Sequence, residues 1–274
     1  MTIVHIVILL VTGAVTGFAG GLLGVGGAFI MGPVQYMVYT SMGIASDVAI
    51  KLAFGTNLLV AFTTAISGTW RHHRMGVVWW RTALIMGSFS LAGSFGGATL
   101  ATQLPGEALK IAFGAIVIIA AARMLVSGQP RTEGEPAEKL WQYAAWALPI
   151  GFITGLVGIG GGVLVVPVLA TVFRFRMHNA IATSLAMIIL TSIGGVTGYI
   201  WGGIGVADLP AYSVGYVNLQ SWLLLVVTSA IMVQVGAITA HKLPARLLRY
   251  IFVAIMFYMA FKMLGVFDWL GWPV

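Results

Sequence analysis

Two clusters of adjacent glycines are the residues in this chain best suited to binding chemistry. Each cluster precedes a short apolar segment, one ending near Pro33 and the other near Pro167. Consecutive glycines interrupt a helix, so each following segment begins with backbone N–H groups that lack a helical partner, and these groups favour an oxyanion. We therefore predict an anion site at the two clusters. The glycines are Gly26 and Gly27 in the first cluster and Gly160, Gly161 and Gly162 in the second.

Other glycines in the same segments favour helix packing instead of binding. Gly17 and Gly21 are four residues apart, and so are Gly151 and Gly155. Small residues at this spacing let membrane helices approach closely, and packing is the interpretation that we favour for these four. Adjacent glycines disrupt the helix that they would pack, so binding is favoured for the clusters.

Six polar side chains fall inside apolar segments and are further candidates for substrate contact. A hydroxyl or amide in the middle of a membrane must find a hydrogen-bond partner. The partner of a hydroxyl can be a carbonyl of the preceding turn or of a neighbouring helix. For Asn57 we favour the substrate or another helix, because an amide is not satisfied so locally. The six residues are Gln35, Thr56, Asn57, Thr183, Ser184 and Gln234.

Lys51 is a basic residue well inside an apolar segment, four residues after Asp47 and on the same face of the predicted helix. In the interpretation that we favour, the two residues form a neutralised pair at the end of their helix. In the alternative, Lys51 attracts an anion, as could His178, its counterpart in the repeat described next.

The chain is a duplicated unit. At an offset of 134 residues Gly17 matches Gly151 and Pro33 matches Pro167, and at an offset of 127 Thr56 matches Thr183. We expect repeat 1 at residues 1–126, a polar linker at 127–140, and repeat 2 at 141–274. Each repeat divides into five helical elements, with a helix broken by glycine or a re-entrant hairpin in each. The elements are 3–23, 27–40, 47–69, 77–101, 106–126, 141–158, 162–173, 179–200, 220–240 and 245–264.

The composition is that of an integral membrane protein whose fold is all-α. Of the 274 residues, 59% are hydrophobic and 8% are charged, and the mean hydropathy is +1.01. The net charge of +7 lies in short clusters between apolar segments, which is typical of membrane topology and not of nucleic-acid binding. Cysteine is absent, which excludes disulfides and thiolate chemistry. No cofactor or metal is expected.

The distribution of positive charge predicts two repeats of opposite orientation. Segments 70–81, 123–139, 174–178 and 241–249 hold eleven of the 14 Lys and Arg residues and are assigned to the cytoplasm. Equivalent loops of the two repeats then lie on opposite faces, with both termini outside. This inversion requires an odd number of crossings per repeat, either five or three. We expect residues 1–19 to stay in the mature chain.

The glycine motif, its duplication and the length together resemble the TauE/SafE family of sulfite and organosulfonate transporters. The motif is Gly-x-x-x-Gly-Leu-x-Gly-[Val/Ile]-Gly-Gly-x-x-x-x-x-Pro, present twice, and a Thr-containing helix follows each copy. The resemblance covers both halves and implies a permease for a small sulfur-containing or carboxylated anion, often an exporter, in the cytoplasmic (inner) membrane. The first copy departs from the second at Ala28, where the second has Gly162.

The favoured hypothesis is a secondary transporter that works by alternating access between inverted repeats. An anion channel is the alternative. An intramembrane enzyme is disfavoured, because the chain has no Cys, no His-Glu-x-x-His motif and no pair of acidic residues inside the spans. The expected partners are the small anion and the lipid bilayer. Substrate identity, direction, coupling ion and oligomeric state are left open.

Overall fold

The computed structural model describes residues 1–23, 28–126, 140–239 and 245–266, and in these ranges the fold is almost entirely helical. A two-stranded antiparallel hairpin, β1 (Ser213–Val214) and β2 (Val217–Asn218), precedes α9. The helices are α1 (Ile3–Leu23), α2 (Ala28–Ser41), α3 (Ser46–Arg74), α4 (Trp80–Gln103), α5 (Gly106–Val126), α6 (Leu140–Val157), α7 (Gly162–Thr171), α8 (Met177–Gly203), α9 (Leu219–Thr239) and α10 (Ala245–Met263).

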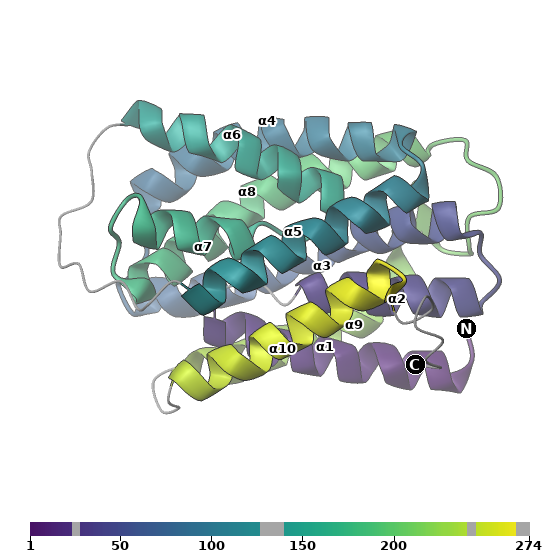
Figure 1. Ribbon diagram of the computed structural model, residues 1–274, viewed down its shortest axis with the longest axis horizontal. Coiled ribbons are helices and arrows are strands. Elements are labelled where there is room, and N and C mark those ends of the chain that lie inside the picture. Colours follow the sequence, from purple (N-terminus) through teal and green to yellow (C-terminus); the bar gives the residue numbers. More distant parts are fainter. Residues whose placement is uncertain (24–27, 127–139, 240–244, 267–274) are drawn as a thin grey trace.

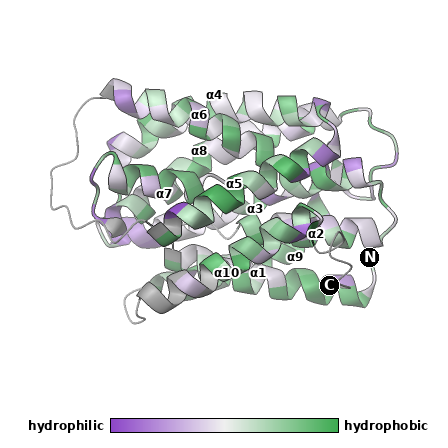
Figure 2. Cartoon of the chain, viewed as in Figure 1, coloured by the Kyte–Doolittle hydropathy of each residue, from purple (hydrophilic) through white to green (hydrophobic). Residues whose placement is uncertain are grey.

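The helices form a bundle whose apolar lengths suit a bilayer. Among the described residues, five helices are long and apolar enough to cross a membrane: α1, α3, α4, α8 and α9. Figure 2 shows hydrophobic residues along the helices and hydrophilic residues mainly near the two ends of the bundle. The all-α membrane fold predicted from the sequence is therefore confirmed.

The helices α2 and α7 are short and follow the two glycine motifs. In Figure 1, α2 lies toward the end of the bundle that holds the N-terminus, and α7 lies toward the opposite end. The break before α7 spans 158–161, while the break before α2, residues 24–27, lies outside the described residues. Each short helix thus begins inside the bundle.

The fourth helix of each repeat packs against the other repeat. α4 contacts α6 and α8 extensively and α3 only slightly, while α9 contacts α1 and α3. α3 also packs on α8, and α5 packs on α10. Matching helices of the two halves therefore make matching contacts, although the boundaries and the inverted orientation of the repeats stay predictions.

We call α4 and α9 the exchanged helices, because each packs against the other repeat. Glycines bring these two helices into close contact with their partners. A Cβ added at Gly155 would collide with the backbone of Ser94 in α4, and one added at Gly21 would collide with the backbone of Val233 in α9. Gly17 and Gly151 meet the backbones of Ser229 and Ser90 in the same way. The packing role predicted for these four glycines is confirmed, because only glycine allows backbones this close.

The basic segments gather at one end of the bundle. Figure 1 places the C-terminal ends of α3, α5, α7 and α9 together, away from the N-terminus. Among the described residues, this end carries Arg71 and Arg74 in the last turn of α3, and Arg174 and Arg176 before α8. The distribution of charge in the sequence predicts that these arginines lie on the same side of the membrane, and the fold places their segments at the same end of the bundle.

Candidate functional site

The second glycine cluster forms a sharp break between α6 and α7. Gly158, Gly160 and Gly161 have φ values of 63°, 75° and 81°, a left-handed conformation that favours glycine. Gly161 is the N-cap of α7 and makes no side-chain hydrogen bond to the first turn. A Ser or Asp residue at an N-cap usually makes such a bond. The polar backbone of this turn is therefore not covered by side chains of its own.

The first turn of α7 presents backbone donors next to a buried hydroxyl. The N–H groups of Leu164 and Val165 bond the Gly161 carbonyl, at 3.0 and 2.9 Å, and those of Gly162 and Val163 have no acceptor within the helix. A Cβ on Gly161 would lie 3.2 Å from the Thr154 hydroxyl oxygen. Thr154 is fully buried, and its hydroxyl has no hydrogen-bond partner. The N–H groups of Gly162 and Val163 and the Thr154 hydroxyl together form a small cluster of hydrogen-bond donors.

Asn57 ties the two glycine regions together. Its amide nitrogen donates to the Ala28 carbonyl at 2.8 Å and to the Gly158 carbonyl at 2.5 Å. Both amide hydrogens are thus used, and the buried Oδ1 has no partner. The predicted contact of Asn57 with another helix is confirmed, because its partners begin α2 and end α6. Asn57 therefore fixes the start of α2 against the glycine break of the other repeat.

Thr56 and Thr183 hold the N-terminal ends of the exchanged helices. The Thr183 hydroxyl accepts a hydrogen bond from the N–H of Trp79, the N-cap of α4, at 3.1 Å. The Thr56 hydroxyl accepts one from the N–H of Asn218, immediately before α9, at 2.9 Å. Each hydroxyl thus satisfies a backbone donor of the other repeat, which is a structural role. Contact of either hydroxyl with a substrate stays a prediction.

The remaining predicted polar residues are hydrogen-bonded to other parts of the fold. The Ser184 hydroxyl donates to the Ile181 carbonyl of its own helix at 2.8 Å. The Gln234 amide donates to the carbonyl and hydroxyl oxygens of Ser67, both at 2.8 Å, and links α9 to α3. Gln35 is fully buried in α2, and its amide nitrogen has no partner.

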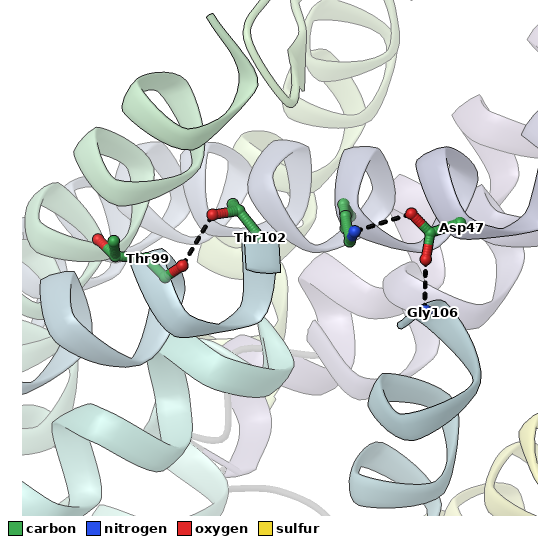
Figure 3. A network of polar contacts seen from close by, with 5 residues as sticks. Asp47, Thr99, Thr102 and Gly106 are labelled. Carbon is green, nitrogen blue, oxygen red and sulfur yellow. Dashed lines mark hydrogen bonds and ion pairs between the residues drawn. The ribbon is translucent and has the colours of Figure 1, made fainter. Parts of the chain in front are cut away.

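Lys51 and Asp47 form the ion pair that the sequence favours. The Lys51 Nζ lies 2.7 Å from Asp47 Oδ2, and the Lys51 side chain is only 7% exposed. Asp47 also accepts from the N–H of Gly106 at 2.5 Å, which joins α3 to the start of α5 (Figure 3). The Tyr216 ring centroid is 5.9 Å from Nζ, and burial together with the negative charge of Asp47 raises the Tyr216 pKa. An attraction of Lys51 for substrate stays a prediction.

The structure brings Asn57 to Gly158, two residues before the cluster Gly160 to Gly162, whereas Gly26 and Gly27 lie outside the described residues. His178 is exposed at the start of α8. Sequence reasoning missed Thr154 as a site residue. Its signal was available, because Thr154 is a hydroxyl-bearing residue in the second glycine motif, at a position where the first motif has Gly20.

The sequence of the chain is similar to those of known proteins. A model of the family described as sulfite exporter TauE/SafE matches residues 9–263. The chain belongs to this TauE/SafE family. A probable membrane transporter protein of Methanocaldococcus jannaschii is 30% identical over 94% of both chains. One of Haemophilus influenzae is 27% identical over 94% of this chain and 97% of its own.

A further relative in the TauE/SafE family is the probable membrane transporter protein YunE of Bacillus subtilis, 30% identical over 72% of this chain and 79% of its own. No solved structure matches the chain. The family and these relatives establish a multi-pass membrane transporter and not an enzyme. In the part of the chain that the structure describes, no group of three or more His, Cys, Asp or Glu could hold a metal ion.

Proposed function

We propose that this TauE/SafE protein transports a small sulfur oxyanion, such as sulfite or an organosulfonate. The observation that carries the proposal is the unpartnered Thr154 hydroxyl beside the first turn of α7. The hydroxyl and the N–H groups of Gly162 and Val163 are neutral donors at the positive end of a helix dipole. The three oxygens of a sulfite or sulfonate group can accept from such donors without a buried fixed cation.

The glycines allow the ligand to approach this turn. A Cβ added at Gly160 would lie 3.1 Å from the Ala61 Cβ and 3.4 Å from the Ala28 Cβ. Even the methyl side chain of alanine at this position would therefore be in tight contact with its neighbours. A larger side chain at Gly161 would meet the Thr154 hydroxyl, the donor that we assign to the anion. The backbone of the turn therefore contributes the binding groups, and the absence of side chains leaves them accessible.

In this proposal the two repeats are inverted and the transporter works by alternating access between them. The matching contacts of the two halves support it, as do the opposite positions of α2 and α7 in Figure 1. Because α4 and α9 are exchanged, each moving body would combine helices from both repeats. Gly26 and Gly27 would present the equivalent donors of repeat 1.

The proposed direction is export across the cytoplasmic membrane, with both termini outside and the linker inside. The common end that carries Arg71, Arg74, Arg174 and Arg176 supports this orientation, since basic loops stay in the cytoplasm. The same arginines would raise the local concentration of anions at the inner mouth. The name of the matching family model, sulfite exporter, agrees with this direction.

The experiment that tests the proposal measures the flux of labelled sulfite, methanesulfonate and acetate in proteoliposomes. We expect saturable transport of at least one sulfur oxyanion, and counterflow when unlabelled anion is present on the far side. A protein that elutes as a folded species but moves none of these anions would contradict the proposal. Large currents without saturation or counterflow would identify a channel instead of a carrier.

A further inference from the structure

A second group of buried polar side chains lies between α2, α3 and the first turn of α9. The Tyr39 hydroxyl donates to the side-chain amide oxygen Oε1 of Gln35 at 3.4 Å and lies next to the hydroxyls of Thr56 and Ser221. These four side chains are completely shielded from solvent. We call them, together with Trp222, the α2–α9 polar cluster.

The α2–α9 polar cluster contains donors without acceptors. Among the described residues, the buried side-chain atoms that lack a partner include Gln35 Nε2, Ser221 Oγ and Trp222 Nε1. Trp222 packs against the apolar cluster that contains Met31 and Val38, which lie on either side of Gln35 in α2. A buried polar group without a partner is costly, so a ligand or water is expected to occupy such a place.

Packing alone does not require polar side chains at the positions of Gln35 and Tyr39, because repeat 2 has apolar residues at both equivalent positions. At the offset of 134 residues Gln35 corresponds to Leu169 and Tyr39 corresponds to Phe173. Both are fully buried in one hydrophobic cluster. At the offset of 139 residues Trp222 corresponds to Ala83. Neither Gln35 in repeat 1 nor Trp222 in repeat 2 therefore has a polar counterpart in the other repeat, so their unpartnered donors are not part of the architecture that the two repeats share.

We propose that the α2–α9 polar cluster is a second binding station for the transported oxyanion. The proposal rests on the proposed function, since it assigns another position to the same substrate. The three unpartnered groups include the NH donors of Gln35 and Trp222, which suit an acceptor-rich ligand and disfavour a metal cation. Ser221 lies in the first turn of α9, where the helix dipole also favours negative charge.

The location gives the station a role in the transport cycle. Gln35 and Tyr39 lie on α2 between the first glycine break and the turn that joins α2 to α3. Thr56 of the cluster is adjacent in sequence to Asn57, which contacts the glycine break before α7. An anion at the station would thus lie between the glycine break and the end of the bundle that holds the N-terminus. It would be the last position before release in an exporter.

The test replaces Gln35 and Tyr39 by the residues of repeat 2, as Gln35→Leu and Tyr39→Phe. Calorimetric titration of purified protein with sulfite should find two sites in the wild type and one in Gln35→Leu, or a second site about tenfold weaker. Gln35→Leu removes an amide nitrogen without a partner but also the acceptor of the Tyr39 hydroxyl, so stability is measured in the double variant with Tyr39→Phe, whose unfolding temperature should not fall. Gln220→Leu, the same change one residue before Ser221, is the control and should keep both sites.

Flux measurements separate failure of this proposal from failure of the proposed function. If the wild type transports sulfite and Gln35→Leu has the same stoichiometry and the same KM on both sides of the membrane, the station does not exist. If the wild type neither binds nor transports any sulfur oxyanion, the proposed function itself fails. Loss of one site in Gln35→Leu, with transport retained and KM raised on one side only, supports the station.

Discussion

The Thr183 hydroxyl accepts a hydrogen bond from the backbone N–H of Trp79 at 3.1 Å, across the boundary between the two repeats. The counterpart of this contact joins Thr56 to the N–H of Asn218 at 2.9 Å. In both contacts a threonine hydroxyl in the third helix of one repeat accepts a hydrogen bond from the backbone at the start of the fourth helix of the other repeat. The pair of contacts explains why a hydroxyl recurs at this position of the repeat.

Replacing Thr183 by Val should destabilise the protein. The change keeps the shape of the side chain but removes the acceptor of the Trp79 N–H, a partly buried hydrogen bond whose loss should cost about 0.5–1.5 kcal/mol. Thr183→Ser keeps the hydroxyl and should unfold near the wild-type temperature. Thermal unfolding in detergent measures both variants. Equal unfolding temperatures for the Val and Ser variants would show that this hydrogen bond contributes nothing.

Substitution of Gly161 should abolish transport. In Gly161→Val the side chain would enter a left-handed backbone position and meet the Thr154 hydroxyl, which lies 3.2 Å from the Cβ position. Gly76→Val is the matched control, because Gly76 has a φ of 69° but open space around its Cβ position. The control carries the backbone strain without obstructing the site. Similar transport rates for the two variants would place the anion elsewhere.

Thr154→Val should lower substrate affinity without lowering stability. The Thr154 hydroxyl has no protein partner, so its removal breaks no internal hydrogen bond. Loss of one donor to an anion should raise KM by about tenfold, which corresponds to about 1.4 kcal/mol. Thr154→Ser retains the donor and should restore most of the affinity. A Val variant with wild-type KM, or one that unfolds early, would contradict the assigned role.

Gly155→Ala should destabilise the contact between α6 and α4. The added methyl group would collide with the backbone of Ser94, so the helices must separate. Gly96→Ala in α4 is the control, because its Cβ position is 4.0 Å from the nearest neighbouring side chain, Phe152. Alanine favours helix over glycine by about 1 kcal/mol, and the control should be slightly more stable. The two unfolding temperatures should move in opposite directions from that of the wild type.

The orientation of the chain can be measured with single cysteines, because the natural sequence has none. Met75 and Tyr212 are exposed, at 45% and 73%. Met75 follows the C-terminal end of α3 and Tyr212 lies between α8 and α9, two places that Figure 1 shows at opposite ends of the bundle. In intact cells, a thiol reagent that does not cross the membrane should label Tyr212→Cys and not Met75→Cys. In inside-out vesicles the pattern should reverse. The opposite labelling in both preparations would overturn the proposed topology.

Much of the helical framework could be predicted from the sequence because it follows from local properties. The apolar segments from 47 to 69 and from 179 to 200 became the central parts of α3 and α8, since a membrane span must satisfy its own backbone. The spacing of Gly151 and Gly155 predicted close packing. The sequence did not identify the partner helix of these glycines, because that depends on long-range contacts with no local pattern.

The candidate site was predicted only in part, and Thr154 shows the physical reason. A hydroxyl in an apolar segment usually bonds a carbonyl of the preceding turn, as Thr171 does with Pro167 at 2.7 Å. Only the three-dimensional contacts reveal that Thr154 lacks such a partner and lies beside Gly161. Asn57 was correctly expected to reach another helix, but its two carbonyl partners are far from it in the sequence.

The exchange of α4 and α9 also imposes an order of events on biosynthesis. α4 is made before α6 and α8, the helices on which it packs, so it enters the membrane with Gly93, Ser94 and Gly97 not yet covered. The first half alone cannot bury that surface in its native way. Assembly of α4 must wait until the ribosome has delivered α6 and α8, which follow the linker in the chain.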